Sequence, residues 1–113
     1  FVVWRGLHEG RYILCVSNDI LSEYEEIIAQ KTTSSVAKHV VDALVDCDFV
    51  EFVDPQFKLG LITNDPDDNK FVDCAFAANA TFIVSEDRHF DVLSAIDFPK
   101  ILVLKLKQFA AML

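Results

Sequence analysis

Short apolar runs alternate along the chain with longer stretches of helical periodicity. Runs at residues 12–16, 49–53, 81–85 and 101–104 are short enough to be strands buried within a sheet. Apolar residues recur every three or four positions in residues 1–9, 19–31, 34–46, 65–79 and, more briefly, 90–96 and 107–113, which predicts helices. Strands that alternate with helices form parallel βαβ crossovers, so we expect an α/β fold, a three-layer α/β/α sandwich with a mainly parallel sheet.

The segment DPDD opens the helix predicted at residues 65–79 with three carboxylates. Asp65 suits the N-cap, Pro66 suits the first helical position, and Asn79 can close the helix. Asp67 and Asp68 would then lie in the first turn, where the helix dipole favours negative charge. Capping alone could therefore account for these acids.

Three acidic side chains nevertheless face the predicted core at one edge of the sheet. Ligands of open α/β sheets bind at the carboxyl ends of the strands, where Asp87 follows strand 81–85 and where helix 65–79 begins. Asp68 lies three residues before Phe71 on the apolar stripe of its helix, and Glu23 lies three residues after Ile20 on another such stripe. We therefore expect the carboxylates of Glu23, Asp68 and Asp87 to converge.

Inward carboxylates of like charge have to be neutralised. Lys70 or Arg88 could neutralise them as structural ion pairs, and a hard divalent cation, Mg²⁺ or Mn²⁺, could do so through oxygen ligands. The pattern leaves both explanations open. Asp65 is interpreted first as the cap and second as a supporting or direct ligand. Lys70, Arg88 and His89 could each contact a substrate phosphate or serve as a surface counter-charge.

Composition narrows the classes of function. The chain has 113 residues, of which 52% are hydrophobic, enough for a single domain with a substantial core. Its formal net charge of −8 is unlike that of a protein that binds phosphates through lysine and arginine. Either the partner is basic, or the acids hold cations that contact phosphates themselves.

Three cysteines and the absence of long apolar runs indicate the compartment. Cys15, Cys47 and Cys74 lie in separate apolar runs without zinc-binding spacing, so we expect buried free thiols in a reducing environment. No run is long enough to span a membrane, and no signal peptide is visible. These features favour a cytoplasmic location.

Three segments of the chain together resemble a PIN domain. They are SNDILSEYEEII at 17–28, DPDDNKFVDCAFAANATFIVSEDRHFDVL at 65–93 and ILVLKLKQFAAML at 101–113. The long central segment is specific, because the acidic opening, the Ala-rich helix and the strand ending in Ser-x-Asp occur in the expected order and spacing. The branch it looks most like comprises toxin components with a DPDDNKF-type segment.

This resemblance implies a metal-dependent endoribonuclease that uses Mg²⁺ or Mn²⁺. It implies catalytic and metal-ligand roles for Glu23, Asp68 and Asp87, with Ser85 and Asp65 in support, and it leaves Lys70 and Arg88 as weaker candidates for substrate contacts. An RNA substrate, a cognate antitoxin and a homodimer are the partners implied.

The start of the chain departs from the family pattern. The family's first strand ends in an aspartate, whereas this sequence begins with FVVWRGLHEG, which corresponds to the following helix. We therefore expect a single PIN-like domain over residues 1–113 that is N-terminally incomplete, with the central strand position empty. A catalytically inactive PIN-like module that binds RNA or a protein partner is the alternative function, and a phosphoacceptor receiver-like domain is a third.

Overall fold

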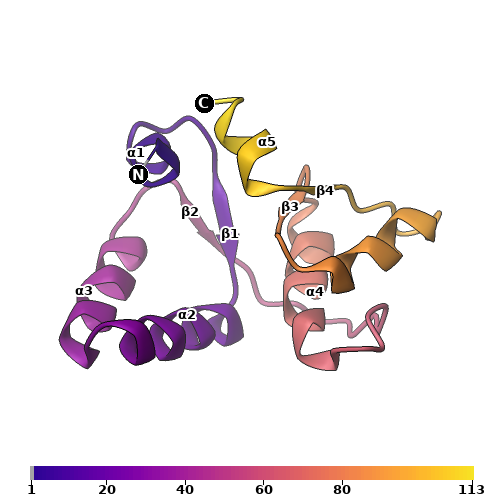
Figure 1. Cartoon of the computed structure of the whole chain (residues 1–113), viewed down its shortest axis with the longest axis horizontal. Coiled ribbons are helices and arrows are strands. Elements are labelled where there is room, and N and C mark those ends of the chain that lie inside the picture. The colour runs from indigo at the N-terminus through magenta and orange to yellow at the C-terminus, as the bar shows by residue number, and fades with distance from the viewer. Residues whose placement is uncertain (1) are drawn as a thin grey trace.

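The computed structural model describes residues 2–113, and its elements follow the predicted order (Figure 1). They are α1 (Val2–His8), β1 (Leu14–Val16), α2 (Asn18–Lys31), α3 (Ser34–Val45), β2 (Val50–Phe52), η1 (Pro66–Asp68), α4 (Asn69–Ala78), β3 (Ile83–Val84), η2 (Arg88–Ala95), β4 (Val103–Leu104) and α5 (Leu106–Ala110). The strands are shorter than the apolar runs predicted. The segment after β3 forms a 3₁₀ helix, and so does η1, the first turn of the helix expected at 65–79.

The strands form two separate parallel pairs. β1 pairs with β2, placing Leu14 opposite Val50, and β3 pairs with β4, placing Ile83 opposite Val103. The helices α1, α2 and α3 lie around the first pair, and α4, η2 and α5 lie around the second (Figure 1). The parallel pairing and the α/β character are thus as predicted, whereas the described residues form no single continuous sheet.

The caps of α2 and α3 show how local sequence sets the helix starts. Ser17 Oγ accepts a hydrogen bond from the Ile20 N–H at 3.3 Å, and Thr33 Oγ1 accepts one from the Val36 N–H at 3.1 Å. Ile27 of α2 and Val36 of α3 are apolar but 41% and 43% exposed. A two-stranded pair is too narrow to cover helices of 14 and 12 residues, so parts of their apolar faces stay in contact with solvent.

Most of the buried hydrophobic side chains within residues 2–113 fall into two clusters. The first contains Leu7, Val16, Ile20, Leu44, Val50 and Cys74. The second contains Ile62, Val72, Phe90, Leu93 and Ile101. Helix α4 contributes to both, through Cys74 to the first and Val72 to the second, and Phe71 packs against both. This helix therefore joins the two halves of the molecule.

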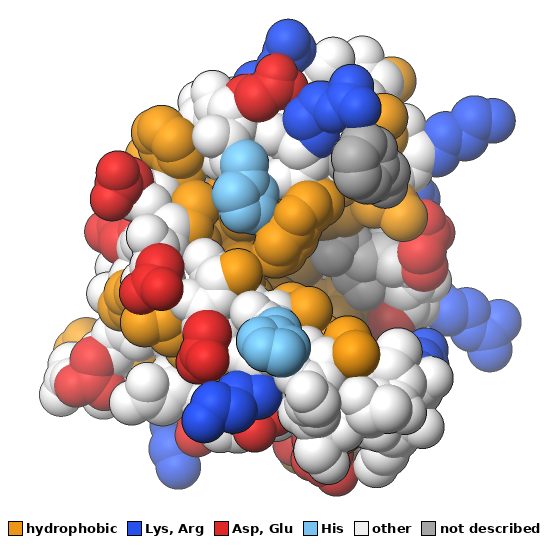
Figure 2. Space-filling view, turned by 90° about the vertical axis from the view of Figure 1, so that its left-hand side faces the viewer, with side chains coloured by type: hydrophobic (Ala, Val, Ile, Leu, Met, Phe, Trp, Pro, Cys, Tyr) orange, Lys and Arg blue, Asp and Glu red, His pale blue; other side chains and the backbone are white. Residues whose placement is uncertain are grey.

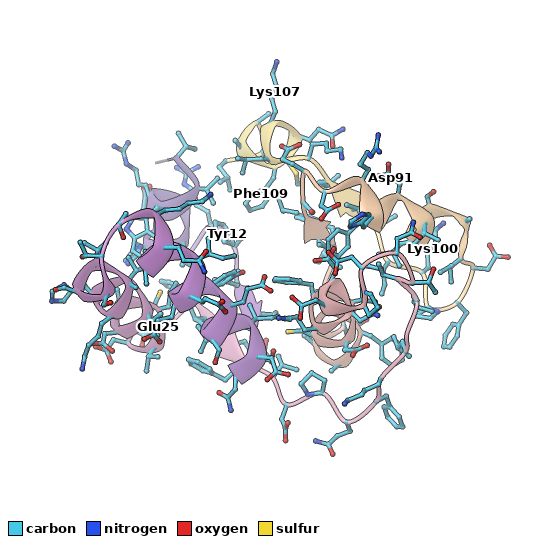
Figure 3. All side chains as sticks on the ribbon, turned by 60° about the horizontal axis from the view of Figure 1, so that its bottom comes forward. Tyr12, Glu25, Asp91, Lys100, Lys107 and Phe109 are labelled. Carbon is cyan, nitrogen blue, oxygen red and sulfur yellow. The ribbon has the colours of Figure 1, made fainter. Side chains whose placement is uncertain are left out.

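An apolar cavity of about 820 Å³ lies between the two strand pairs. Cys15 of β1 and Val84 of β3 line it from either side, and Ala75 of α4 lines it as well. Tyr12 and Phe109 approach each other across the space between the halves, with ring centroids 4.9 Å apart (Figure 3). The two pairs are separate sheets among the described residues, and the expected central strand between them stays a prediction.

The surface on the side of α1 and α3 is hollowed and lined by hydrophobic side chains (Figure 2). Lysine and arginine side chains lie around the periphery of that face rather than across it (Figure 2). The face therefore presents no broad basic surface for a phosphate backbone.

Two further expectations concern thiols and membranes. All three cysteines are free, as predicted, but only Cys74 is fully buried, and Cys15 and Cys47 are half-buried. Burial raises the pKa of the Cys74 thiol to about 11, so this thiol is unreactive at neutral pH. Within residues 2–113 no helix is both long and apolar enough to cross a membrane.

If α4 joins the two clusters into one cooperative unit, damage to either cluster should destabilise both halves. Leu93→Ala and Leu44→Ala each remove a buried leucine and should each cost about 2–5 kcal/mol. Trp4, the sole tryptophan, lies in α1, far along the chain from Leu93. The urea concentration at the midpoint of unfolding should therefore be lower for both variants. Trp4 fluorescence and circular dichroism should give the same midpoint.

Phe57→Ala serves as the control, because Phe57 is 70% exposed and its loss should change the free energy of unfolding by less than about 0.5 kcal/mol. A Leu93→Ala variant whose Trp4 transition stays at the parent midpoint would show that the two clusters unfold independently.

Candidate metal site

The loop before α4 is fastened to that helix by two polar side chains. Asn69 both donates to the Ile62 carbonyl and accepts from the Ile62 N–H, each at 2.9 Å. The Asp73 carboxylate accepts from the Leu59 N–H at 3.1 Å. The loop therefore packs over Asp73, which is half-buried. These hydrogen bonds fix the segment that leads to Asp65 relative to α4.

Asp65 and Asp68 have different roles at the start of α4. Asp65 Oδ1 accepts from the Asp67 N–H at 3.3 Å, so the predicted capping role of Asp65 is confirmed. Asp68 occupies the N-cap position of α4, but its side chain makes no capping hydrogen bond. Capping therefore does not explain the Asp68 carboxylate, which is only 15% exposed.

Asp87 is oriented by the turn that leaves β3. Ser85 Oγ accepts from the Asp87 N–H at 3.0 Å, and Asp87 Oδ1 in turn accepts from the His89 N–H at 2.9 Å. Phe90, the next residue, is buried in the second cluster and anchors the turn. Ser85 thus positions Asp87, which is consistent with the supporting role that the resemblance implies.

The two segments meet in a group of four potential ligands: Asp65, Asp68, Asp87 and His89. One ligand atom from each lies within 4.8 Å of the others. His89 Nδ1 stands 3.2 Å from Asp87 Oδ1, 3.4 Å from Asp68 Oδ2 and 3.7 Å from Asp65 Oδ2. The carboxyl end of β3 and the start of α4 therefore share one edge of the fold, as predicted.

The electrostatics of the group reflect crowding of like charges. Burial, and then the negative charge of Asp65, raise the pKa of the Asp68 carboxyl. The His89 backbone N–H, through its hydrogen bond, lowers the pKa of Asp87. Asp68 Oδ2 and His89 Nδ1 are buried, 3.4 Å apart, and have no hydrogen-bond partner among residues 2–113. Two buried polar atoms without hydrogen bonds within residues 2–113 thus lie in the same group of potential ligands.

Glu23 lies outside this group, in a salt bridge with Lys70. The Lys70 Nζ stands 2.8 Å from Glu23 Oε1 and 3.2 Å from Asp67 Oδ1. The hydrogen bond to Glu23 raises the pKa of Lys70. Of the two explanations left open by the sequence, the ion pair therefore applies to Glu23. Arg88, the other cation considered there, is exposed.

The sequence pattern indicates Asp65 only secondarily as a metal ligand, and it does not indicate His89 as one. The Asp87-x-His89 spacing directly after a strand is the sequence feature that indicates a shared site, because a turn can bring both side chains to the same side of the chain. Which side they face depends on the bonds from Ser85 and to the His89 N–H, and side-chain periodicity does not encode these bonds.

The donor set fits a divalent cation. Opposite ligands of an octahedral Mg²⁺ stand about 4 Å apart, since each bond is about 2 Å long. The four ligand atoms lie within 4.8 Å of one another, so small side-chain movements would complete the geometry. Three carboxylates suit hard cations, and an imidazole nitrogen suits transition metals.

A family model of the PIN domain matches residues 1–89, which is most of the chain. No curated protein matches the chain, and no solved structure matches it. The matched region contains all four residues of the acidic group, the Ser85 turn and the helix that joins the two clusters. The chain belongs to the PIN-domain family.

Proposed function

We propose that this chain is a metal-dependent endoribonuclease whose cation, Mg²⁺ or Mn²⁺, is held by Asp65, Asp68 and Asp87. PIN domains are generally nucleases, and the group of carboxylates at the start of α4 supplies oxygen ligands. The observation that carries the proposal is the buried Asp68 Oδ2, which has no hydrogen-bond partner in the described part of the chain and lies beside two further carboxylates.

Charge arithmetic supports a divalent ion over a structural ion pair. Asp65, Asp68 and Asp87 carry a formal charge of −3 when ionised, and His89 can contribute at most +1. The group then keeps a net charge of −2, or of −3 with a neutral imidazole, that none of its own side chains neutralises. Lys70 does not serve there, because Glu23 and Asp67 hold it. One divalent cation would match the remainder.

The protein groups would position the reaction components. A bound divalent cation lowers the pKa of coordinated water and stabilises charge on a scissile phosphate. Asp68 and Asp87 would orient that cation, Ser85 would fix the backbone at Asp87, and Asp65 would contribute the oxygen not used in capping. Arg88, exposed beside Asp87, would contact a substrate phosphate.

The finer parts of the proposal rest on the sequence resemblance. RNA as the substrate and a toxin role with a basic antitoxin segment are consistent with a formal net charge of −8. Glu23 remains a predicted ligand that would have to exchange Lys70 for the cation. That same pairing favours the alternative, a PIN-like module that binds RNA or protein without cleaving it.

Cleavage of a labelled single-stranded RNA tests the activity. We expect cleavage with Mg²⁺ or Mn²⁺ and none with EDTA. Asp68→Asn removes a ligand charge without removing a capping hydrogen bond, so cleavage should fall by about 10²-fold or more, the size of a lost electrostatic group in an active site.

Asp42→Asn is the matched control, because Asp42 is an exposed aspartate on α3 and should leave cleavage unchanged. Cleavage that persists in EDTA, or that Asp68→Asn leaves intact, would contradict the proposal. Metal binding without any cleavage would favour the non-catalytic module.

The raised pKa of Asp68 predicts a pH-dependent gain in stability for Asp68→Asn in the absence of metal. The folded state binds the Asp68 proton more readily than the unfolded chain, so the ionised carboxylate lowers stability as pH rises through the folded pKa. Asp68→Asn should therefore be more stable than the parent at pH 7. The gain should vanish below pH 3.8, the ordinary pKa of the group.

Thermal melting with and without Mn²⁺ completes this test. At 100 times its dissociation constant, Mn²⁺ should stabilise the parent by about 2.7 kcal/mol, and Asp68→Asn should lose most of that increment. A variant that is less stable than the parent without metal would show that the carboxylate is structural.

A further inference from the structure

We propose that His89 is a ligand of the bound cation through Nδ1, and that it makes the site prefer Mn²⁺ to Mg²⁺. The inference rests on the proposed metal site and adds to it a nitrogen donor from η2. It also replaces the two roles that the sequence allowed for His89, a phosphate contact and a surface counter-charge.

The position of Nδ1 excludes a surface role for that atom. The His89 side chain as a whole is 39% exposed, yet Nδ1 itself is buried. It faces Asp65, Asp68 and Asp87 at 3.2 to 3.7 Å and has no hydrogen-bond partner. A substrate phosphate arriving from solvent would meet another part of the ring. Nδ1 is aimed at the point where the three carboxylates converge.

The backbone holds the imidazole in this orientation. The His89 N–H donates to Asp87 Oδ1 at 2.9 Å, and Asp87 is tied in turn to Ser85. Phe90 is 3% exposed and packs in the second cluster, directly after His89. His89 Nδ1 and the Asp87 carboxylate thus belong to one turn anchored by Phe90, which suits ligands that must keep their relative geometry.

An imidazole nitrogen changes the metal preference of an otherwise oxygen-only site. Mg²⁺ binds oxygen ligands and retains water, whereas imidazole nitrogen binds transition metals readily, and Mn²⁺ accepts both donors. Coordination through Nδ1 requires a neutral ring with its proton on Nε2. The site would then take a cation with three carboxylate donors and one nitrogen donor.

Pulsed electron paramagnetic resonance of the Mn²⁺-loaded protein tests the assignment directly. A coordinated imidazole should give ¹⁴N modulation in the electron spin echo, and ¹⁵N-histidine labelling should change it. His89→Ala should abolish the modulation while Mn²⁺ still binds. His39→Ala is the control, because His39 is an exposed histidine on α3, and its variant should keep the modulation.

Calorimetric titration gives an independent readout. His89→Ala should weaken Mn²⁺ binding by about tenfold or more, and Mg²⁺ binding by much less, since Mg²⁺ replaces the nitrogen with water. Bound Mn²⁺ without ¹⁴N modulation, or equal losses for the two metals, would overturn the role of His89 and leave the carboxylate site intact. Absence of Mn²⁺ binding at the group in the parent would overturn the proposed metal site itself.

Discussion

The packing of α4 between two apolar clusters determines where Asp65 and Asp68, two of the four candidate ligands, lie. Cys74 and Val72 point into different clusters, and Phe71 contacts both, so the helix can neither rotate nor slide without opening a core. Its first residues are then fixed as well. Asn69 holds the preceding loop, and Asp68 is held at the boundary between buried and exposed surface. Hydrophobic packing thus supplies the rigidity on which a metal site depends.

The crowded carboxylates of Asp65, Asp68 and Asp87 lower the stability of the fold. Residues that lower stability in this way indicate a functional role. The three carboxylates repel one another around the His89 imidazole. The raised pKa of Asp68 reflects the free-energy cost of burying its ionised carboxylate there. Nearby, Lys70 forms salt bridges with both Glu23 and Asp67, so the fold does place a lysine beside other acids of this region. The uncompensated group at the start of α4 therefore marks the place where a cation from solvent would bind.

The sequence predicts local features well because they depend on nearby residues. The left-handed Asn79, with φ of 52°, ends α4 as expected, and Asp65 caps the turn before it. The rule that ligands gather at the carboxyl ends of parallel strands also brings Asp68 and Asp87 together correctly. The pairing of Lys70 with Glu23 spans 47 residues and depends on how α2 meets α4, which periodicity alone does not specify. The orientation of His89 Nδ1 is not predictable from periodicity for a related reason, since it depends on the turn made by Ser85 and Asp87.

Anomalous diffraction from crystals soaked in Mn²⁺ tests the central claim most directly. The account predicts a single strong peak about 2 Å from Asp68 Oδ2, with Asp87 and His89 Nδ1 as further ligands. A peak held by other carboxylates, with none between Asp68 and Asp87, would contradict it.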